Sequence, residues 1–141
     1  MKKLLLLLIL LTPLMAEVKS FMCGINVLLG GSDKQLMIPD SKIQYLFLLQ
    51  VQASNKLVNW QGTKFQNYTE NSSEVMASSQ PRILGEVATI NRSKTEIIFN
   101  KFNGNLRESI FYEIKSPIED ELVWVESSFA KYLCKKTKSL L

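Results

Sequence analysis

The chain has 141 residues, of which 17 are Lys or Arg, 13 are Asp or Glu and none is His. Without histidine, Ser-His-Asp triads, Cys-His pairs, imidazole-ligated zinc and histidine proton shuttles are excluded. This length suits a single domain with one core.

Residues 1–16 have the pattern of a secretory signal peptide. A basic start precedes an unbroken apolar run over residues 4–11, and Pro13 interrupts that run shortly before Ala16. Such a run is far shorter than the about 20 residues that a membrane-spanning helix needs. We therefore expect cleavage close to Ala16 and export to a periplasm or beyond, in a bacterium. The alternative is a retained N-terminal anchor or a buried strand.

Cleavage would leave residues 17–141 as one mostly β domain. Losing Lys2 and Lys3 leaves 15 basic against 13 acidic side chains, a net charge of +2. A surface this close to neutral gives no electrostatic reason to expect nucleic acid or an anionic membrane as the main partner. We expect no permanent membrane span once the signal is removed.

The two cysteines lie near opposite ends of that domain, at Cys23 and Cys134. An even number of cysteines in an exported chain favours one disulfide. The bond would hold the two terminal segments side by side, as suits neighbouring strands. The alternative is a pair of free, buried thiols.

Apolar residues in the first half recur mostly at every second position, which predicts short strands separated by turn residues. The clearest case begins at Lys42, where Ile43, Tyr45 and Phe47 share one face. Four strands are expected in this half, at residues 21–29, 35–38, 42–52 and 57–65, the last bent near Gly62.

Residues 66–82 are mostly polar, with little to bury, and predict a long loop. Within the 70–80 stretch, Ser72 or Ser73 would cap a short helical turn that ends at Ala77. A loop of this length in a compact domain is commonly functional or disordered.

The second half predicts further strands, and Asn103-Gly104 is the strongest hairpin signal in it. Residues 126–136 allow two interpretations: Phe129, Tyr132 and Leu133 have helical spacing, but we favour a strand over a C-terminal helix. Strands are expected at residues 83–90, 95–102, 106–115 and 122–125, with a turn at 91–94. The predicted fold is an antiparallel meander of six to eight strands that forms a small barrel or sandwich.

Candidate site residues are few. Trp60, Phe65 and Tyr68 are a candidate ligand-stacking edge beside the long loop, although strand aromatics more often belong to the core. No pattern for a metal or a cofactor is present, and the acidic run 119–121 lacks the spaced oxygen ligands and the glycine of a calcium loop. We expect no catalytic, cofactor-binding or metal-binding residues.

These exclusions favour a non-catalytic binding domain, whose partner is a protein or a small apolar ligand and whose contacts lie on the long loop. One alternative is a carboxylate-dependent glycan hydrolase, which needs two acids converging in a cleft, one of them with a raised pKa. The other is a structural subunit of an envelope assembly. That alternative predicts a large exposed apolar patch or an uncovered strand edge.

Overall fold

The computed structural model describes residues 17–29, 35–84, 90–118 and 120–137, so the predicted signal peptide lies outside the described residues. The described residues form strands and one 3-10 turn, η1 (Asp40–Lys42). The strands are β1 (Lys19–Leu29), β2 (Gln35–Met37), β3 (Phe47–Gln52), β4 (Leu57–Trp60), β5 (Thr63–Phe65), β6 (Thr69–Glu70), β7 (Glu74–Ser78), β8 (Arg82–Ile83), β9 (Ile90–Asn100), β10 (Asn105–Lys115) and β11 (Leu122–Lys136).

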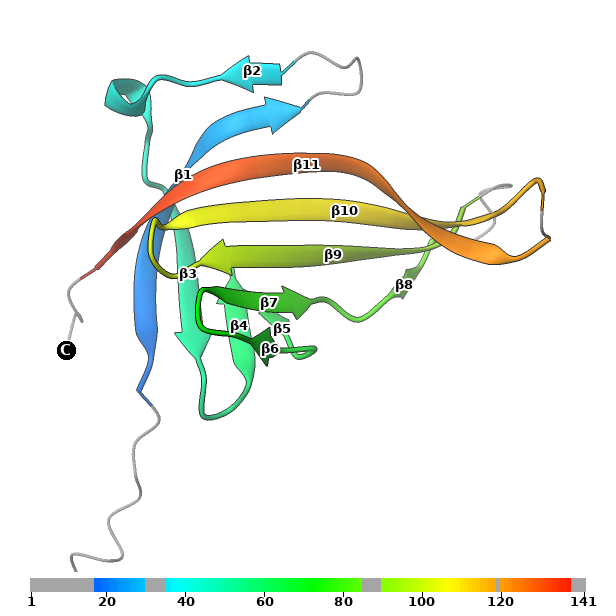
Figure 1. Cartoon of the computed structure of the whole chain (residues 1–141), viewed down its shortest axis with the longest axis horizontal. Helices are drawn as coiled ribbons and strands as arrows, with labels where there is room; N and C mark the ends of the chain where they lie inside the picture. The colour runs from blue at the N-terminus through cyan, green and yellow to red at the C-terminus, as the bar shows by residue number, and fades with distance from the viewer. Residues whose placement is uncertain (1–16, 30–34, 85–89, 119, 138–141) are drawn as a thin grey trace, which may run out of the picture.

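All eleven strands belong to one antiparallel sheet (Figure 1). Its order is β5-β4-β3-β1-β11-β10-β9-β7-β6, with β2 paired to β1 and β8 paired to β9. Strands β9, β10 and β11 form a meander, and the two terminal strands β1 and β11 lie next to each other. The predicted antiparallel β class and its meander are therefore confirmed.

The sheet is rolled, so that its two halves face each other across one core. The ring of Phe21 on β1 lies 4.8 Å from that of Phe99 on β9, and Trp60 on β4 lies 5.0 Å from Tyr132 on β11. None of these strands are neighbours in the sheet. The two end strands, β5 and β6, follow each other in the chain but are not paired, and the sheet is not closed into a barrel. The prediction of a closed barrel or a two-sheet sandwich was wrong.

Part of the meander extends beyond the core as a three-stranded projection, shown on the right of Figure 1. We call it the arm, and it comprises residues 90–95 of β9, 110–115 of β10 and 122–129 of β11. Pairing between β1 and β11 runs only from Phe21 opposite Lys136 to Leu28 opposite Ala130. Strand β1 ends one residue later, at Leu29, and its last three residues pair with β2 on the other side.

The predicted strand at 42–52 is shorter than expected, because its first half crosses over β1 instead of pairing with it. A Cβ added at Gly24 would meet Ile43 Cγ2 at 2.3 Å and the Gln44 carbonyl oxygen at 2.6 Å. Only glycine permits this approach. Regular pairing begins where Phe47 lies opposite Cys23.

The predicted bent strand at 57–65 is instead a tight hairpin of β4 and β5. Gln61 and Gly62 both have positive φ, at 51° and 82°. Two such residues form the mirror-image turn whose twist matches that of paired strands. Thr63 therefore lies opposite Trp60.

The prediction of a long loop at 66–82 was wrong, as was the helical turn within it. This stretch contains β6, β7 and the first residue of β8, and β7 buries Val75 and Ala77 on alternate positions. The predicted turn at 91–94 was also wrong, because β9 runs through it without a break. Of the predicted strand at 83–90, residues 85–89 lie outside the described residues.

The C-terminal helix was likewise wrong, and the favoured strand is confirmed. Strand β11 runs from Leu122 to Lys136 as one element, longer than the two predicted segments. It buries Ala130, Tyr132 and Cys134, which are two residues apart. This period of two suits a sheet face rather than a helix face.

Candidate functional site

A cavity of about 610 Å³ opens at one end of the rolled sheet. Its walls come from β1, β3, β7 and β9, together with the turn between β9 and β10. Ligand pockets commonly measure about 300–1,000 Å³, so a small organic molecule would fit.

The floor of the cavity is apolar. Phe21, Val51, Val75 and Phe99 line it, and the last three are buried in the core. Phe99 lies directly opposite Val75 on the neighbouring strand. Because alternate side chains of a strand point to the same face, each strand places its apolar residues toward the cavity.

The rim of the cavity carries charge of both signs, with lysines in excess. Lys19, Lys101 and Lys136 face two carboxylates, Glu17 and Glu70. Among the described residues, neither Lys19 nor Lys136 makes an ion pair. Neither ammonium group therefore forms an ion pair within the described part of the chain, although Lys19 lies close enough to Glu70 to help lower the pKa of that carboxyl.

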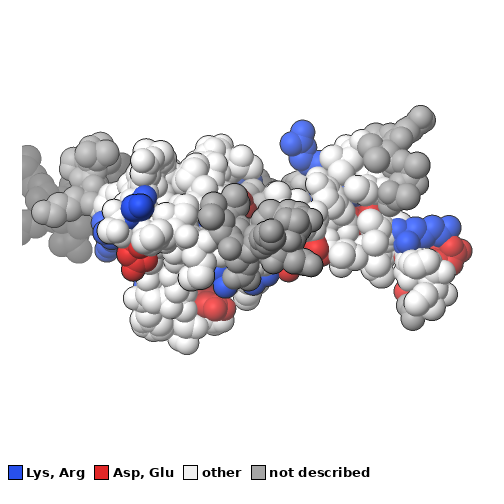
Figure 2. All heavy atoms as spheres, turned by 90° about the horizontal axis from the view of Figure 1, so that it is seen from above, with Lys and Arg blue, Asp and Glu red and all other residues white. Residues whose placement is uncertain are grey.

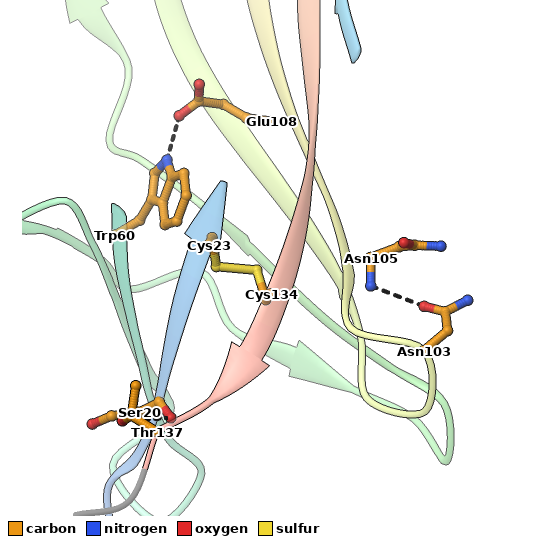
Figure 3. The surroundings of a disulfide bond; sticks show 8 residues. All are labelled: Ser20, Cys23, Trp60, Asn103, Asn105, Glu108, Cys134 and Thr137. Carbon is orange, nitrogen blue, oxygen red and sulfur yellow. Dashed lines mark hydrogen bonds between the residues drawn. A yellow bond between two sulfur atoms is a disulfide. The ribbon is translucent and has the colours of Figure 1, made fainter. Parts of the chain in front are cut away.

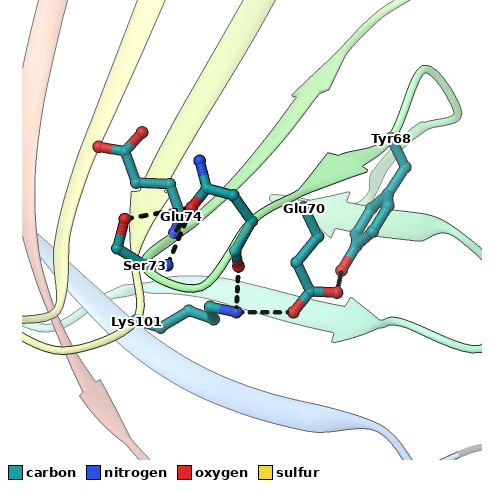
Figure 4. A network of polar contacts seen from close by, with 6 residues as sticks. Tyr68, Glu70, Ser73, Glu74 and Lys101 are labelled. Atoms are coloured by element: carbon teal, nitrogen blue, oxygen red, sulfur yellow. Dashed lines mark hydrogen bonds and ion pairs between the residues drawn. The ribbon is translucent and has the colours of Figure 1, made fainter.

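A polar network fixes one side of this rim (Figure 4). Lys101 Nζ lies 2.8 Å from Glu70 Oε1 and donates to the Asn71 carbonyl oxygen at 2.7 Å. The Tyr68 hydroxyl donates to Glu70 Oε2 at 2.8 Å. The hydrogen bond from Lys101, followed by that from Tyr68, lowers the pKa of Glu70. Burial, with help from Glu70, raises the pKa of Tyr68 to about 12.

The wall formed by the β9–β10 turn is held rigidly against β11. Gly104 has φ +73°, and a Cβ there would lie 2.3 Å from the Cys134 carbonyl oxygen. The Cys134 amide donates to the Gly104 carbonyl oxygen at 2.8 Å. Asn103 Oδ1 accepts from the Asn105 amide at 2.9 Å (Figure 3). Beside this turn, the Phe102 side chain is 79% exposed at the cavity.

The predicted disulfide is confirmed and adjoins the cavity. Cys23 and Cys134 lie opposite each other on β1 and β11, and their sulfur atoms are bonded (Figure 3). Cys134 also lines the cavity. The bond joins the two strands that carry Lys19 and Lys136, and so it supports both free lysines of the rim.

The predicted ligand edge is not brought together as a site. Trp60 and Phe65 are 2% and 3% exposed and belong to the core. The Trp60 indole N–H donates to Glu108 (Figure 3). The other oxygen of Glu108 accepts from the Tyr132 hydroxyl. Tyr68 is partly buried and serves the rim through Glu70. The cavity residues Phe21, Val51, Val75 and Phe99 were not singled out in the sequence, because their alternation indicates only that they face inward.

Two carboxylates line the cavity, Glu17 and Glu70. The pKa of Glu70 is lowered, which does not suit the general acid of a glycan hydrolase, because that role needs a raised pKa. Within the described ranges there is no cluster of three or more metal-ligating side chains. The charged side chains visible from above form small, separated groups of either sign (Figure 2).

No protein family model, curated protein or solved structure matches this chain. No helix among the described residues is long and apolar enough to span a membrane.

Proposed function

We propose that this protein is a non-catalytic binder of a small amphipathic molecule that has an apolar body and one anionic group. The observation that carries the proposal is the cavity of about 610 Å³, with its apolar floor and lysine-rich rim. Apolar walls with a few placed polar groups are typical of small-molecule sites. The apolar body would cover Phe21 and Phe99, and the anion would lie between Lys19 and Lys136.

The charges at the rim determine whether an anionic or a cationic ligand is favoured. Lys101 is already engaged by Glu70, so Lys19 and Lys136 are the cations that an added anion would meet. An ammonium ligand would find only Glu17 without such a partner in the described structure. The rim therefore favours a carboxylate, sulfate or phosphate over a cation.

We also propose export, with removal of residues 1–16. The disulfide supports this proposal, because such bonds persist in oxidising compartments. Cleavage after Ala16 would make Glu17 the new N-terminus and add its ammonium group to the cavity rim. N-terminal sequencing of the native protein tests the cleavage, and recovery of Met1 from a cytosolic fraction would overturn it.

Isothermal titration of the purified protein with dodecanoate, and with dodecyltrimethylammonium as the cation of matched tail, tests the ligand class. We expect dodecanoate to bind with the higher affinity. Replacing Lys19 and Lys136 together by Ala should weaken its binding about tenfold, since each exposed charge contact contributes up to about 1 kcal/mol. Ala53→Trp should obstruct the cavity, because Ala53 is an exposed turn residue in its lining.

The control is a double replacement of Lys42 and Lys64 by Ala. This removes the same charge from exposed positions that do not line the cavity, and dodecanoate binding should stay unchanged. Equal affinity for the anion and the cation, or full binding by the Ala53→Trp variant, would refute the proposed ligand class and site.

A further inference from the structure

One edge of the arm has no partner in the described structure. Strand β11 pairs with β10 from Leu122 to Leu133, but β1 covers its other side only from Ala130 onward. Residues 122–129 therefore present an open strand edge, visible in Figure 1 where β11 leaves β1 behind. An open edge offers unpaired N–H and C=O groups to another strand.

The opposite edge of the arm is covered, by contrast. Strand β8 pairs with β9 at Ser93 and Arg92. The Ser79 amide donates to the Thr95 carbonyl oxygen at 2.8 Å, and the Leu84 amide donates to Asn91 at 3.3 Å. The arm therefore offers one open edge, which is on β11.

The hairpin that precedes β11 determines which of its backbone N–H and C=O groups point to the open side. The Ser116 amide donates to the Glu121 carbonyl oxygen at 2.7 Å, so these two residues form a hydrogen-bonded pair. Bonded and non-bonded pairs alternate along an antiparallel ladder. Leu122, Trp124 and Glu126 lie in the non-bonded pairs with β10, so their N–H and C=O groups point to the open side.

The side chains on this edge provide little protection against pairing. Residues 122–126 contain no Pro or Lys, which commonly protect edge strands, and their only charge, Glu126, is already engaged by Arg107 at 2.7 Å. Leu122 is 57% exposed and Val125 is 44% exposed. Ser127 is the extra residue of a bulge, since Ser128 pairs with Ile110 and Glu126 with Phe111. The bulge limits the straight part of the edge to residues 122–126.

We propose that this edge pairs with the same edge of a second copy of the chain, antiparallel about a two-fold axis at Trp124. Leu122 then lies opposite the partner's Glu126, and Val123 opposite the partner's Val125. Each copy donates from the Leu122 amide and receives the same bond in return, so the contact is self-complementary. It is a second property of the molecule, independent of the cavity.

Charge disfavours the neighbouring register. Lys115 pairs with Leu122 on β10 and so shares its face; it is in an ion pair with Asp120 of its own copy at 2.7 Å and lies in the same row as the partner's Glu126. An axis at Val123 would instead place Glu126 opposite the partner's Asp120, and two carboxylates facing each other are destabilising. The axis at Trp124 also forms two valine pairs, because Val123 and Val125 of each copy face Val125 and Val123 of the other.

Cysteine cross-linking tests the register directly. Val123 and Val125 would form non-hydrogen-bonded pairs across the interface, where Cα atoms lie about 4.5 Å apart. Under mild oxidation, a mixture of the Val123→Cys and Val125→Cys variants should give a disulfide-linked dimer. Each variant alone should not, since its cysteine faces a valine. No cross-link in the mixture, or equal yields from the single variants, would overturn the proposal.

Sedimentation equilibrium over a concentration series tests the association itself. The unmodified protein should dimerise reversibly. Leu122→Pro should weaken the dimer about tenfold or more, because it removes the Leu122 amide donor from each of the two copies. The hydrogen bonds between β11 and β10 are spared. A circular dichroism melt of the variant would show whether the fold is kept. A monomer at every concentration, or a dimer that Leu122→Pro leaves intact in a folded protein, would contradict it.

Discussion

Two glycines with positive φ occupy turns that differ in their surroundings. Gly62 has φ +82° and no atom within 4 Å of an added Cβ. Gly104 has φ +73°, and an added Cβ would lie 2.3 Å from the Cys134 carbonyl oxygen. At Gly62 only the positive φ disfavours a side chain, whereas at Gly104 the Cys134 carbonyl also occupies the space that a Cβ would need. Their comparison separates conformational strain from close packing.

We therefore expect Gly104→Ala to destabilise the protein more than Gly62→Ala. A left-handed conformation costs an Ala about 1–2 kcal/mol, which is the whole effect expected at Gly62. At Gly104 the backbone of the turn or of β11 must also move, which should raise the loss to about 3 kcal/mol or more. Urea-induced unfolding measures both values. Equal losses would mean that the turn shifts freely away from Cys134.

Single residues in the sequence predicted some of the fold and little of the site. Asn103-Gly104 indicated its hairpin and the cysteines their bond, because both signals depend on local or pairwise chemistry. Trp60 and Phe65 were considered for ligand contact, but both are buried. Whether an aromatic ring faces a core or a ligand depends on what lies opposite it, which in this case is the other half of the rolled sheet.

Among the elements, the long strands were the hardest to predict. Residues 91–94 of β9 look like a turn because they are polar, yet residues 92–94 pair with β10 within the arm and Asn91 forms a bulge. Arg92 is held there by Glu113, and Lys94 lies 4.7 Å from the centre of the Trp124 ring. These polar side chains satisfy their charge across the strands, a relation that periodicity along one strand does not reveal.

Short strands were missed for a different reason. Strand β7 buries only Val75 and Ala77, and β6 is two residues long, so neither produces a strong apolar pattern. Lys101 and the turn at Asn71 hold them in place instead. Their strand conformation depends on pairing with β9, which is distant in sequence.

The arm depends on a carboxylate that acid should disable. Glu113 is 3% exposed, and it accepts hydrogen bonds from Arg92 and Asn91. The bonds from Arg92, followed by that from Asn91, lower its pKa. The unfolded chain therefore binds a proton at a higher pH than the folded one does. The contribution to stability is present above about pH 4.3 and is lost as pH falls through the folded pKa.

We expect Glu113→Gln to reduce the stability at pH 7 and to make the free energy of unfolding less dependent on pH below about 4.3. Arg92→Met alone should be less stable at pH 7 than the double variant that combines Arg92→Met with Glu113→Gln, because the single variant leaves the Glu113 charge covered and unpaired. This difference should shrink on acidification, as Glu113 takes up a proton. Urea titrations between pH 7 and pH 3 measure each free energy. Parallel pH profiles for the wild type and Glu113→Gln would show that Arg92 does not hold this charge.

At the scale of the whole molecule, curvature creates the candidate site. Alternation indicates that Phe21 and Phe99 face inward, but only the roll of the sheet brings β1 within reach of β9 at one end and leaves a cavity there. The amount of roll depends on bulges and on glycine contacts such as that of Gly24 with Gln44. These are properties of the assembled sheet, and no segment of the sequence contains them.

The disulfide should stabilise the rolled sheet at its seam, where its first and last strands, β1 and β11, lie side by side. It joins Cys23 to Cys134 across a sequence separation of 111 residues, connecting the first and the last strand. A disulfide restricts the unfolded chain more as the loop that it closes becomes longer, and losing such a bond typically costs about 2–5 kcal/mol. We expect the double Cys23→Ala and Cys134→Ala variant to lose free energy of unfolding in this range.

Urea unfolding of the wild type with and without reductant, compared with the double variant, provides the measurement. Reductant should destabilise the wild type toward the value of the variant and leave the variant unchanged. Dodecanoate binding should weaken along with stability, because the same bond supports the strands of Lys19 and Lys136. A loss under about 0.5 kcal/mol would mean that the β1–β11 ladder closes the seam without the covalent bond.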